Sequence, residues 1–196
     1  MSNDESTKVK IIEAAIDCFG EFGYDGTSMR LIAEKLGISK PAIYYHFPDK
    51  QHLFQGIVAF VMDKFSNALE TIKNDQTDAI SKLKNVILNL FKPLSDESNI
   101  KRFLHGMFSS DMKHGIKFDH KNMFETQENI ILEIIQQGID EGHFRVDINK
   151  KSFLYALIGT INIYTRDNLL NQAAPINELQ AAQIINQLIQ GVGKPA

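Results

Sequence analysis

The sequence predicts an all-α protein with an N-terminal three-helix module that contains a helix-turn-helix, followed by a larger helical domain. Apolar residues recur at spacings of three and four along most of the 196 residues, and no run of alternating apolar and polar residues reaches strand length. Hydrophobic residues make up 43% of the chain, which is enough to bury a core and excludes a disordered protein. We expect about nine helices in two domains, residues 1–52 and residues 53–196.

Three helices are expected within the N-terminal domain. Their first residues are predicted from side chains that cap helices, and these are Ser6 or Thr7, then Thr27 or Ser28, then Ser39. Gly23 is expected to end the first helix. Gly37 is expected to end the second, because glycine readily adopts the left-handed conformation of a C-cap. Two short helices joined by residues 36–39 form the pattern of a helix-turn-helix.

Six further helices are expected beyond this module. They cover residues 50–73, 79–91, 96–112, 122–141, 150–170 and 177–190. Asp49 and Asn149 are placed to cap two of these helices, and Gly142 is placed to end the long helix before Asn149. Polar or Gly- and Pro-containing segments separate the helices, so the pattern indicates helices joined by short connections.

The third helix of the module has a surface suited to contact with DNA. Ile43 and Phe47 lie four residues apart and can both face inward. The residues left on the outside or at the edge are Lys40, Ala42, Tyr44, Tyr45 and His46. The net charge of −3 does not itself indicate a nucleic-acid binder, but residues 27–56 carry a local excess of two positive charges. We interpret this helix as the part of the chain that contacts DNA.

A longer pattern gives this interpretation a family. The chain carries Gly23-Tyr24-x-x-Thr27-Ser28-Met29-Arg30-x-Ile32-Ala33-x-x-Leu36-Gly37-Ile38-Ser39, followed by Ala42-Ile43-Tyr44-Tyr45-His46-Phe47-x-x-Lys50. This pattern resembles the DNA-binding domain of the TetR family of bacterial transcriptional regulators, the AcrR-like repressors. The resemblance covers nearly every signature position from Ala14 to Leu53, and beyond Leu53 it is one of architecture.

The resemblance implies a sequence-specific DNA-binding transcriptional regulator that acts on a palindromic operator in double-stranded DNA as a homodimer. It implies a repressor that leaves its operator when a small, partly apolar effector binds in the C-terminal domain. The alternative is an effector-independent DNA-binding architectural or division-control protein of the same fold. Ligand-dependent release from DNA would separate the two.

The chemistry of the exposed side chains divides the DNA contacts into two kinds. Tyr44, His46 and Lys50 offer hydrogen bonds or charge to phosphates, as does Thr27 or Ser28 at a helix N-terminus. Lys40, Pro41 and Ala42 are expected to contact bases, while Arg30 can reach a base edge or a phosphate. Tyr45 is interpreted as half packing and half contact, and His46 as a capping histidine is an alternative. The predicted DNA-binding set is Thr27, Ser28, Arg30, Ser39, Lys40, Pro41, Ala42, Tyr44, Tyr45, His46 and Lys50.

The C-terminal part of the chain indicates a subunit interface. Residues 171–193 contain a single charged side chain, Glu178, whereas a helix on a monomer surface normally displays Lys and Glu. Charge depletion is typical of the centre of protein–protein interfaces. We predict that the last two helices pair with their copies in a four-helix dimer interface; a buried hairpin within a monomer is the alternative. The residues predicted to lie there are Ile161, Ile184, Ile185, Leu188 and Ile189.

An aromatic and Met-rich set of residues is suited to an apolar effector, although ordinary core packing is the alternative for each of them. Asn162 and Arg166 are polar groups beside apolar surroundings and could orient such a ligand. The predicted effector-binding residues are Phe103, Met107, Phe108, Met123, Phe124, Asn162, Tyr164 and Arg166.

The sequence carries no pattern of an enzyme site. It has no Gly-rich phosphate loop, no Ser/His/Asp arrangement and no His-x-x-x-His pair, so we expect no catalysis, no cofactor and no metal. Cys18 is the one cysteine and is expected to be a buried apolar residue. The polar start of the chain and the short apolar stretch at residues 153–165 predict neither a signal peptide nor a membrane span. We expect a cytoplasmic bacterial protein that is associated with the nucleoid when bound to DNA and has no membrane partner.

Overall fold

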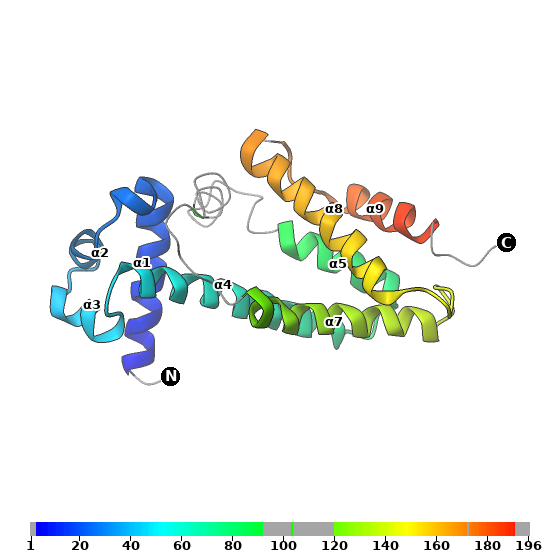
Figure 1. Ribbon diagram of the computed structural model, residues 1–196, viewed down its shortest axis with the longest axis horizontal. Helices are drawn as coiled ribbons and strands as arrows, with labels where there is room; N and C mark the ends of the chain where they lie inside the picture. The colour runs from blue at the N-terminus through cyan, green and yellow to red at the C-terminus, as the bar shows by residue number, and fades with distance from the viewer. Residues whose placement is uncertain (1–2, 92–102, 104–119, 172, 191–196) are drawn as a thin grey trace. The chain divides into compact units, whose positions relative to one another are not determined.

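The computed structural model describes residues 3–91, 103, 120–171 and 173–190, and the described residues contain helices but no strand (Figure 1). This confirms the all-α fold. The helices are α1 (Asn3–Gly26), α2 (Met29–Leu36), α3 (Lys40–His46), α4 (Lys50–Lys73), α5 (Ala79–Phe91), α7 (His120–Asp140), α8 (Lys150–Asn171) and α9 (Glu178–Gln190). The helix predicted for residues 96–112 lies outside the described residues apart from Phe103. In the described part of the chain, no helix is both long and apolar enough to cross a membrane.

The described residues group into two compact units. The first holds α1, α2, α3, the part of α4 up to Asp63, and Phe103. The second holds the remainder of α4 from Lys64 together with α5, α7, α8 and α9. The predicted domain boundary after residue 52 remains a prediction, because units of packing and units of function need not divide at the same residue.

Local signals mark a break within α1 and both ends of α2. Gly23 was expected to end the first helix, but α1 continues to Gly26. Gly23 interrupts the helical backbone of α1 with φ 69° and ψ 178°, in the left-handed half of backbone space where glycine is unstrained. Ser28 caps α2, since its Oγ accepts a hydrogen bond from the Leu31 N–H at 3.1 Å. Gly37 ends α2 with φ 64°, and the next N–H, of Ile38, donates to the Ala33 carbonyl at 3.1 Å. Ser28 therefore opens α2 rather than Thr27.

The short α3 begins as the sequence predicts, with one difference. Ser39 occupies the N-cap position with an extended backbone, but its side chain makes no capping hydrogen bond. Pro41 lies in the first turn, where a missing N–H removes no intrahelical bond. Phe47 ends the helix, and its N–H donates to the Ile43 carbonyl at 2.9 Å. The hydroxyl of Ser39 is therefore not used by the helix it precedes.

The core of the first unit fixes α3 through two apolar side chains. Ile43 is fully buried and Phe47 nearly so. The Phe47 ring packs directly on the backbone of α4 at Gly56, where an added Cβ would lie 2.7 Å from its Cε1. Phe54 of α4 packs at 5.4 Å, edge to face, on Phe19 of α1, and at 5.3 Å on Phe103 (centroid distances). Phe103 is thereby committed to this core.

In the second unit, polar side chains fix the ends of helices. The buried Lys82 ammonium donates to the Lys73 carbonyl at 2.6 Å, at the C-terminus of α4, and to Gln137 Oε1 at 2.8 Å. Asp78 caps α5 by accepting from the Ser81 N–H at 3.0 Å. Glu141 accepts from the Ala79 N–H at 2.9 Å, so two carboxylates serve the N-terminus of α5.

The same unit packs its helices in a chain of contacts. α7 and α9 both pack on α5, α8 packs on α7, and α9 also contacts α8 (Figure 1). Gly142 ends α7 with φ 76°, and Asn149 caps α8 by accepting from the Ser152 N–H at 3.0 Å. Asn177 and Gln180 cap α9 reciprocally, each side chain accepting from the other residue's N–H. These helix boundaries confirm the predicted ones to within two residues.

Candidate DNA-binding surface

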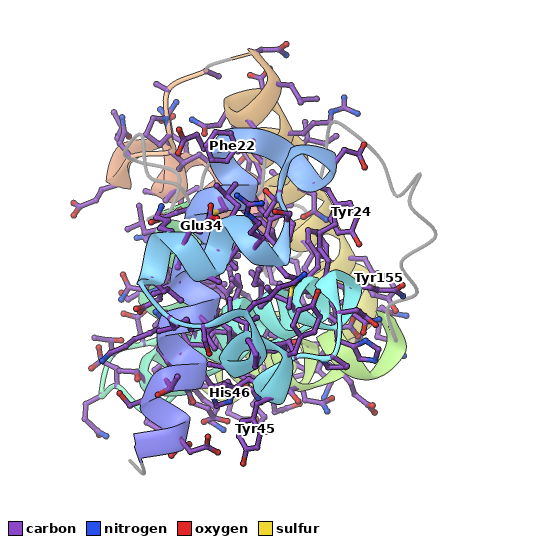
Figure 2. The ribbon with its side chains drawn as sticks, turned by 90° about the vertical axis from the view of Figure 1, so that its left-hand side faces the viewer. Phe22, Tyr24, Glu34, Tyr45, His46 and Tyr155 are labelled. Atoms are coloured by element: carbon purple, nitrogen blue, oxygen red, sulfur yellow. The ribbon has the colours of Figure 1, made fainter. Side chains whose placement is uncertain are left out.

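The outer side of α3 is aromatic and basic. Tyr45 is 78% exposed and projects away from the ribbon (Figure 2), and Tyr44 is also exposed. The Lys40 ammonium lies 5.6 Å from the centroid of the Tyr44 ring, within the range of a cation–π contact. Pro41 is exposed beside them and Ala42 is half-buried. Of the six positions from Lys40 to Tyr45, all except Ile43 are therefore at least partly accessible, which is the arrangement expected of a helix that enters a groove.

His46 lies differently from its tyrosine neighbour. Its side chain is only 8% exposed, and its Nε2 is 3.7 Å from Asp4 Oδ1 in the first turn of α1. The Tyr45 ring meets the His46 ring edge to face at 5.1 Å. Figure 2 shows both residues at the same end of α3. Tyr45 is thus accessible from outside, whereas the position of His46 favours its alternative role as a packed histidine.

Arg30 and Glu34 form an ion pair on the exposed side of α2. Arg30 Nε donates to Glu34 Oε1 at 2.7 Å, and both side chains are more than half exposed. This hydrogen bond raises the pKa of the guanidinium, which is charged in any case. The spacing of four residues could have predicted the pair from the sequence. Arg30 would have to leave Glu34, or share it, in order to bind a phosphate or a base.

Lys35, also on α2, is tied to α1. Its ammonium lies 2.9 Å from Asp17 Oδ2, and the hydrogen bond to Asp17 raises the pKa of Lys35. These residues are 18 positions apart in the sequence, so no short-range pattern marks the pair. Lys35 holds α2 against α1 and adds little free positive charge to the exposed side of α2.

Thr27 does not have the exposure that its predicted phosphate contact needs. It is 1% exposed, and its hydroxyl lies 2.8 Å from the Gly23 carbonyl and 3.0 Å from the Cys18 carbonyl, both of them acceptors. Its N–H donates to the Tyr24 carbonyl at 3.3 Å. Ser28, next in sequence, is exposed at the N-terminus of α2. Of the two alternatives at this helix start, Ser28 has the accessible hydroxyl.

Lys50 is also held within the protein. Its ammonium donates to the Tyr24 carbonyl at 2.7 Å and to the Thr27 carbonyl at 3.0 Å. It lies 4.3 Å from the centroid of the Tyr24 ring. Its predicted partner was a phosphate, but its observed partners are two backbone carbonyls that the sequence pattern does not reveal.

Three of the five residues predicted for the dimer interface are instead in the core of the chain, which corrects that part of the prediction. Ile161 and Ile184 are 4% exposed and Ile185 is fully buried, so these three side chains cannot reach a partner copy. Leu188 and Ile189 are half-buried. The large apolar residues of α8 and α9 that are exposed are Tyr155, Ile163, Tyr164, Leu170 and Leu179.

The predicted effector residues that the structure describes come from both units, and their grouping in one site stays a prediction. Phe103 belongs to the core of the first unit, whereas Asn162, Tyr164 and Arg166 are exposed on α8 and Phe124 is exposed on α7. Met107 and Phe108 lie outside the described residues, and so does the side chain of Met123. Within the described residues, no group of three or more His, Cys, Asp or Glu side chains is placed to hold a metal ion.

Comparison with known proteins identifies the first unit and the fold. Residues 11–57 match the family described as "Bacterial regulatory proteins, tetR family". The chain is 26% identical over 144 residues to the nucleoid occlusion factor SlmA of Photobacterium profundum, which covers 70% of this chain and 72% of SlmA. It is 37% identical over 76 residues to IcaR of Staphylococcus aureus, a negative transcriptional regulator of a biofilm operon, but this match covers only 39% of the chain and 41% of IcaR.

A solved structure has the same fold over most of the chain. The transcriptional regulator FadR of Bacillus subtilis, in complex with stearoyl-CoA, superposes with a TM-score of 0.78 at 21% identity, covering 94% of this chain and 98% of FadR. A likeness at this identity shows the fold alone. Residues 11–57 therefore carry the helix-turn-helix domain of the tetR family of bacterial regulatory proteins, and the chain has the helical fold of the FadR structure.

Proposed function

We propose that this chain is a repressor that binds a palindromic operator in double-stranded DNA as a homodimer and leaves it when a small, partly apolar effector binds in the C-terminal domain. The observation that carries the proposal is the outer side of α3, where Tyr44, Tyr45 and Lys40 are exposed while Ile43 and Phe47 anchor the helix. A helix of this size fits the major groove of B-DNA. The relative from Staphylococcus aureus is a negative regulator, which supports repression.

The exposed side chains divide into contacts that position the protein and contacts that read the sequence. The exposed hydroxyls of Tyr44, Tyr45 and Ser28 can donate to phosphate oxygens, and such contacts fix register without reading bases. Lys40 can donate to guanine O6 and N7, and exposed Pro41 can contact a thymine methyl. Arg30 adds a base or phosphate contact once it is released from Glu34. Ser39 and Ala42, at the start of α3, are the remaining residues of the proposed DNA-binding surface.

The homodimer would be formed by the exposed faces of α8 and α9. Tyr155 is 54% exposed and Ile163 is 58% exposed, two helical turns apart on one face of α8. The outer face of α9 carries Leu179 and glutamines and, after Glu178, has no charged side chain. Amide-rich faces with exposed aromatic and aliphatic residues match the composition of interface centres, which are depleted of charge.

An apolar effector is supported by the bound ligand of the Bacillus subtilis structure, which carries a long acyl chain. We therefore propose an acyl-chain-like molecule as the chemical class to test first. The proposed site is in residues 53–196, and the place of action is the cytoplasm, at the nucleoid.

The experiment that tests DNA binding is footprinting of the purified full chain on its own genomic DNA, followed by measurement of affinity for the protected sequence. Tyr45→Phe removes one exposed hydroxyl and no buried atom, so we expect it to weaken binding by a few-fold per protomer with unchanged stability, as loss of about 0.5–1.5 kcal/mol would give. Lys84→Gln on α5, which lies outside the first unit, is the control and should bind like the wild type. Equal affinity for the protected sequence and for random duplexes would contradict the proposal.

A second candidate function is favoured by the match to SlmA. That protein is a nucleoid occlusion factor, so an effector-independent architectural or division-control role is the alternative for this chain. Binding at many sites spread over the genome, unaffected by acyl-CoA, would favour the alternative. Protection of one or a few operators, released by acyl-CoA, would favour the repressor.

A further inference from the structure

Lys50 bridges two segments of the first unit that are far apart in sequence. It is the first residue of α4, yet its ammonium donates to the carbonyls of Tyr24 and Thr27, which are 26 and 23 residues earlier. The Tyr24 carbonyl is in the last turn of α1 and the Thr27 carbonyl follows directly after this helix, and the Thr27 N–H donates to the Tyr24 carbonyl in the turn that they form. One side chain therefore closes the turn from outside.

The ammonium lies in a site built of three parts. Two are the carbonyl oxygens at 2.7 and 3.0 Å, and the third is the face of the Tyr24 ring at 4.3 Å from its centroid. The Tyr24 ring is itself fixed, since it stacks on Phe19 at 5.7 Å and meets Phe54 edge to face at 5.3 Å. The Lys50 ammonium therefore has two hydrogen-bond acceptors and a cation–π contact, which together satisfy its donors.

The turn that Lys50 closes leads directly into the N-terminus of α2. Thr27 precedes the capping residue Ser28, and the Thr27 hydroxyl is bonded to carbonyls of α1. The free N–H groups and the Ser28 hydroxyl at this helix start are the proposed phosphate contacts of α2. The position of these donors therefore depends on the turn.

We infer that Lys50 is a positioning residue for the N-terminus of α2 and not a phosphate ligand. The inference rests on the proposed DNA-binding function and assigns Lys50 a different task within it. Lys50 is the first residue of α4. Its hydrogen bonds to Tyr24 and Thr27 therefore also couple the position of the start of α2 to the position of the first turn of α4.

The test compares Lys50→Met, Lys50→Arg and, as a charge-matched control on α8, Lys151→Gln, all in the full chain. Amide hydrogen exchange is measured without DNA at Thr27, Leu31 and Ile32, whose N–H groups bond within the turn and the start of α2. We expect Lys50→Met to lower protection there by about tenfold or more, as loss of hydrogen bonds to a charged group would. Lys50→Arg, which keeps a charged donor, should restore much of it, and Lys151→Gln should change nothing.

DNA affinity at several salt concentrations completes the test. A lost phosphate contact would flatten the dependence of log K on log salt by about 0.9 per contact, or about 1.8 for a dimer. Loss of positioning should weaken binding by a similar factor at every salt concentration, since the contacts of Ser28 and the helix N–H groups carry no full charge. Unchanged exchange or a flattened slope would overturn the inference. If the wild type binds no duplex, the proposed function fails, while the exchange data still decide whether Lys50 holds the turn.

Discussion

The packing of Phe47 on Gly56 gives a prediction whose magnitude follows from one distance. A Cβ at residue 56 would lie 2.7 Å from Phe47 Cε1, whereas carbon atoms in contact lie about 3.5–4.0 Å apart. The ring would have to move by about 1 Å in a core where Phe47 is 4% exposed. Overpacking of this kind costs about 1–3 kcal/mol, and replacing a helical glycine by alanine returns about 1 kcal/mol. Gly56→Ala alone should therefore destabilise the first unit by about 0–2 kcal/mol.

A double-mutant cycle isolates the clash from the change in helix propensity. In a Phe47→Leu background the ring atoms are gone, so Gly56→Ala should stabilise the unit by about 1 kcal/mol through helix propensity alone. The expected coupling between the two substitutions is thus about 1–3 kcal/mol and favourable. Unfolding free energies are measured by amide hydrogen exchange of the most protected residues of the first unit, which report on that unit. Additivity within about 0.5 kcal/mol would refute the argument that the ring packs on this backbone.

Three further predictions concern base reading, assembly and pH. Lys40→Ala should relax the preference at one base position of each half-site by about 1–3 kcal/mol, measured by affinity for a set of operator variants, and an equal loss on random DNA would speak against base contact. Tyr155→Glu with Ile163→Glu should give folded monomers in sedimentation, because both side chains are exposed in the single chain; a persistent dimer would place the interface elsewhere. The pKa of Asp78 is lowered chiefly by the hydrogen bond from the Ser81 hydroxyl, and that of Glu141 chiefly by the Ala79 N–H. Since both folded pKa values lie below the unfolded ones, their stabilisation is present above about pH 4 and is lost as pH falls through the folded values, so Asp78→Asn should flatten the acid limb of unfolding profiles.

Most helix boundaries were predictable because their signals are local, whereas α1 begins at Asn3 and not after Ser6 or Thr7. Gly37 and Gly142 adopt positive φ where the sequence places helix ends, and the side chains of Asp49 and Asn149 accept N–H groups three residues later. Such signals depend on a few neighbouring residues and need no knowledge of the core. The aromatic outer side of α3 was predictable for the same reason, since Ile43 already indicates which side faces inward.

The orientation of α8 and α9 was not predictable in this way. Apolar residues occur on nearly every side of α8, so their spacing does not mark one face. The polar side of α9 carries amides and almost no charge, so it resembles an interface as much as a solvent-exposed surface. The sequence indicated that these helices must be covered, but it assigned the fully buried Ile185 to a partner copy when it packs within the chain. Ile185→Glu would therefore lower the stability of the unit and would not test whether the protein is a dimer. Only substitutions of exposed residues test dimer formation.

The polar residues of the helix-turn-helix differ in whether the protein already satisfies them, and this decides what their removal would do. Thr27 and Lys50 have their donors committed to backbone carbonyls, so removing either changes where α2 begins. Tyr45 and Lys40 are exposed, so removing either side chain changes the surface that contacts DNA. The first kind of change acts before DNA is bound and should appear in hydrogen exchange of the free protein; the second should appear only in affinity and its salt dependence. A signature motif therefore mixes residues that hold the helix-turn-helix in place with residues that contact DNA, and the hydrogen bonds within the unbound protein separate them.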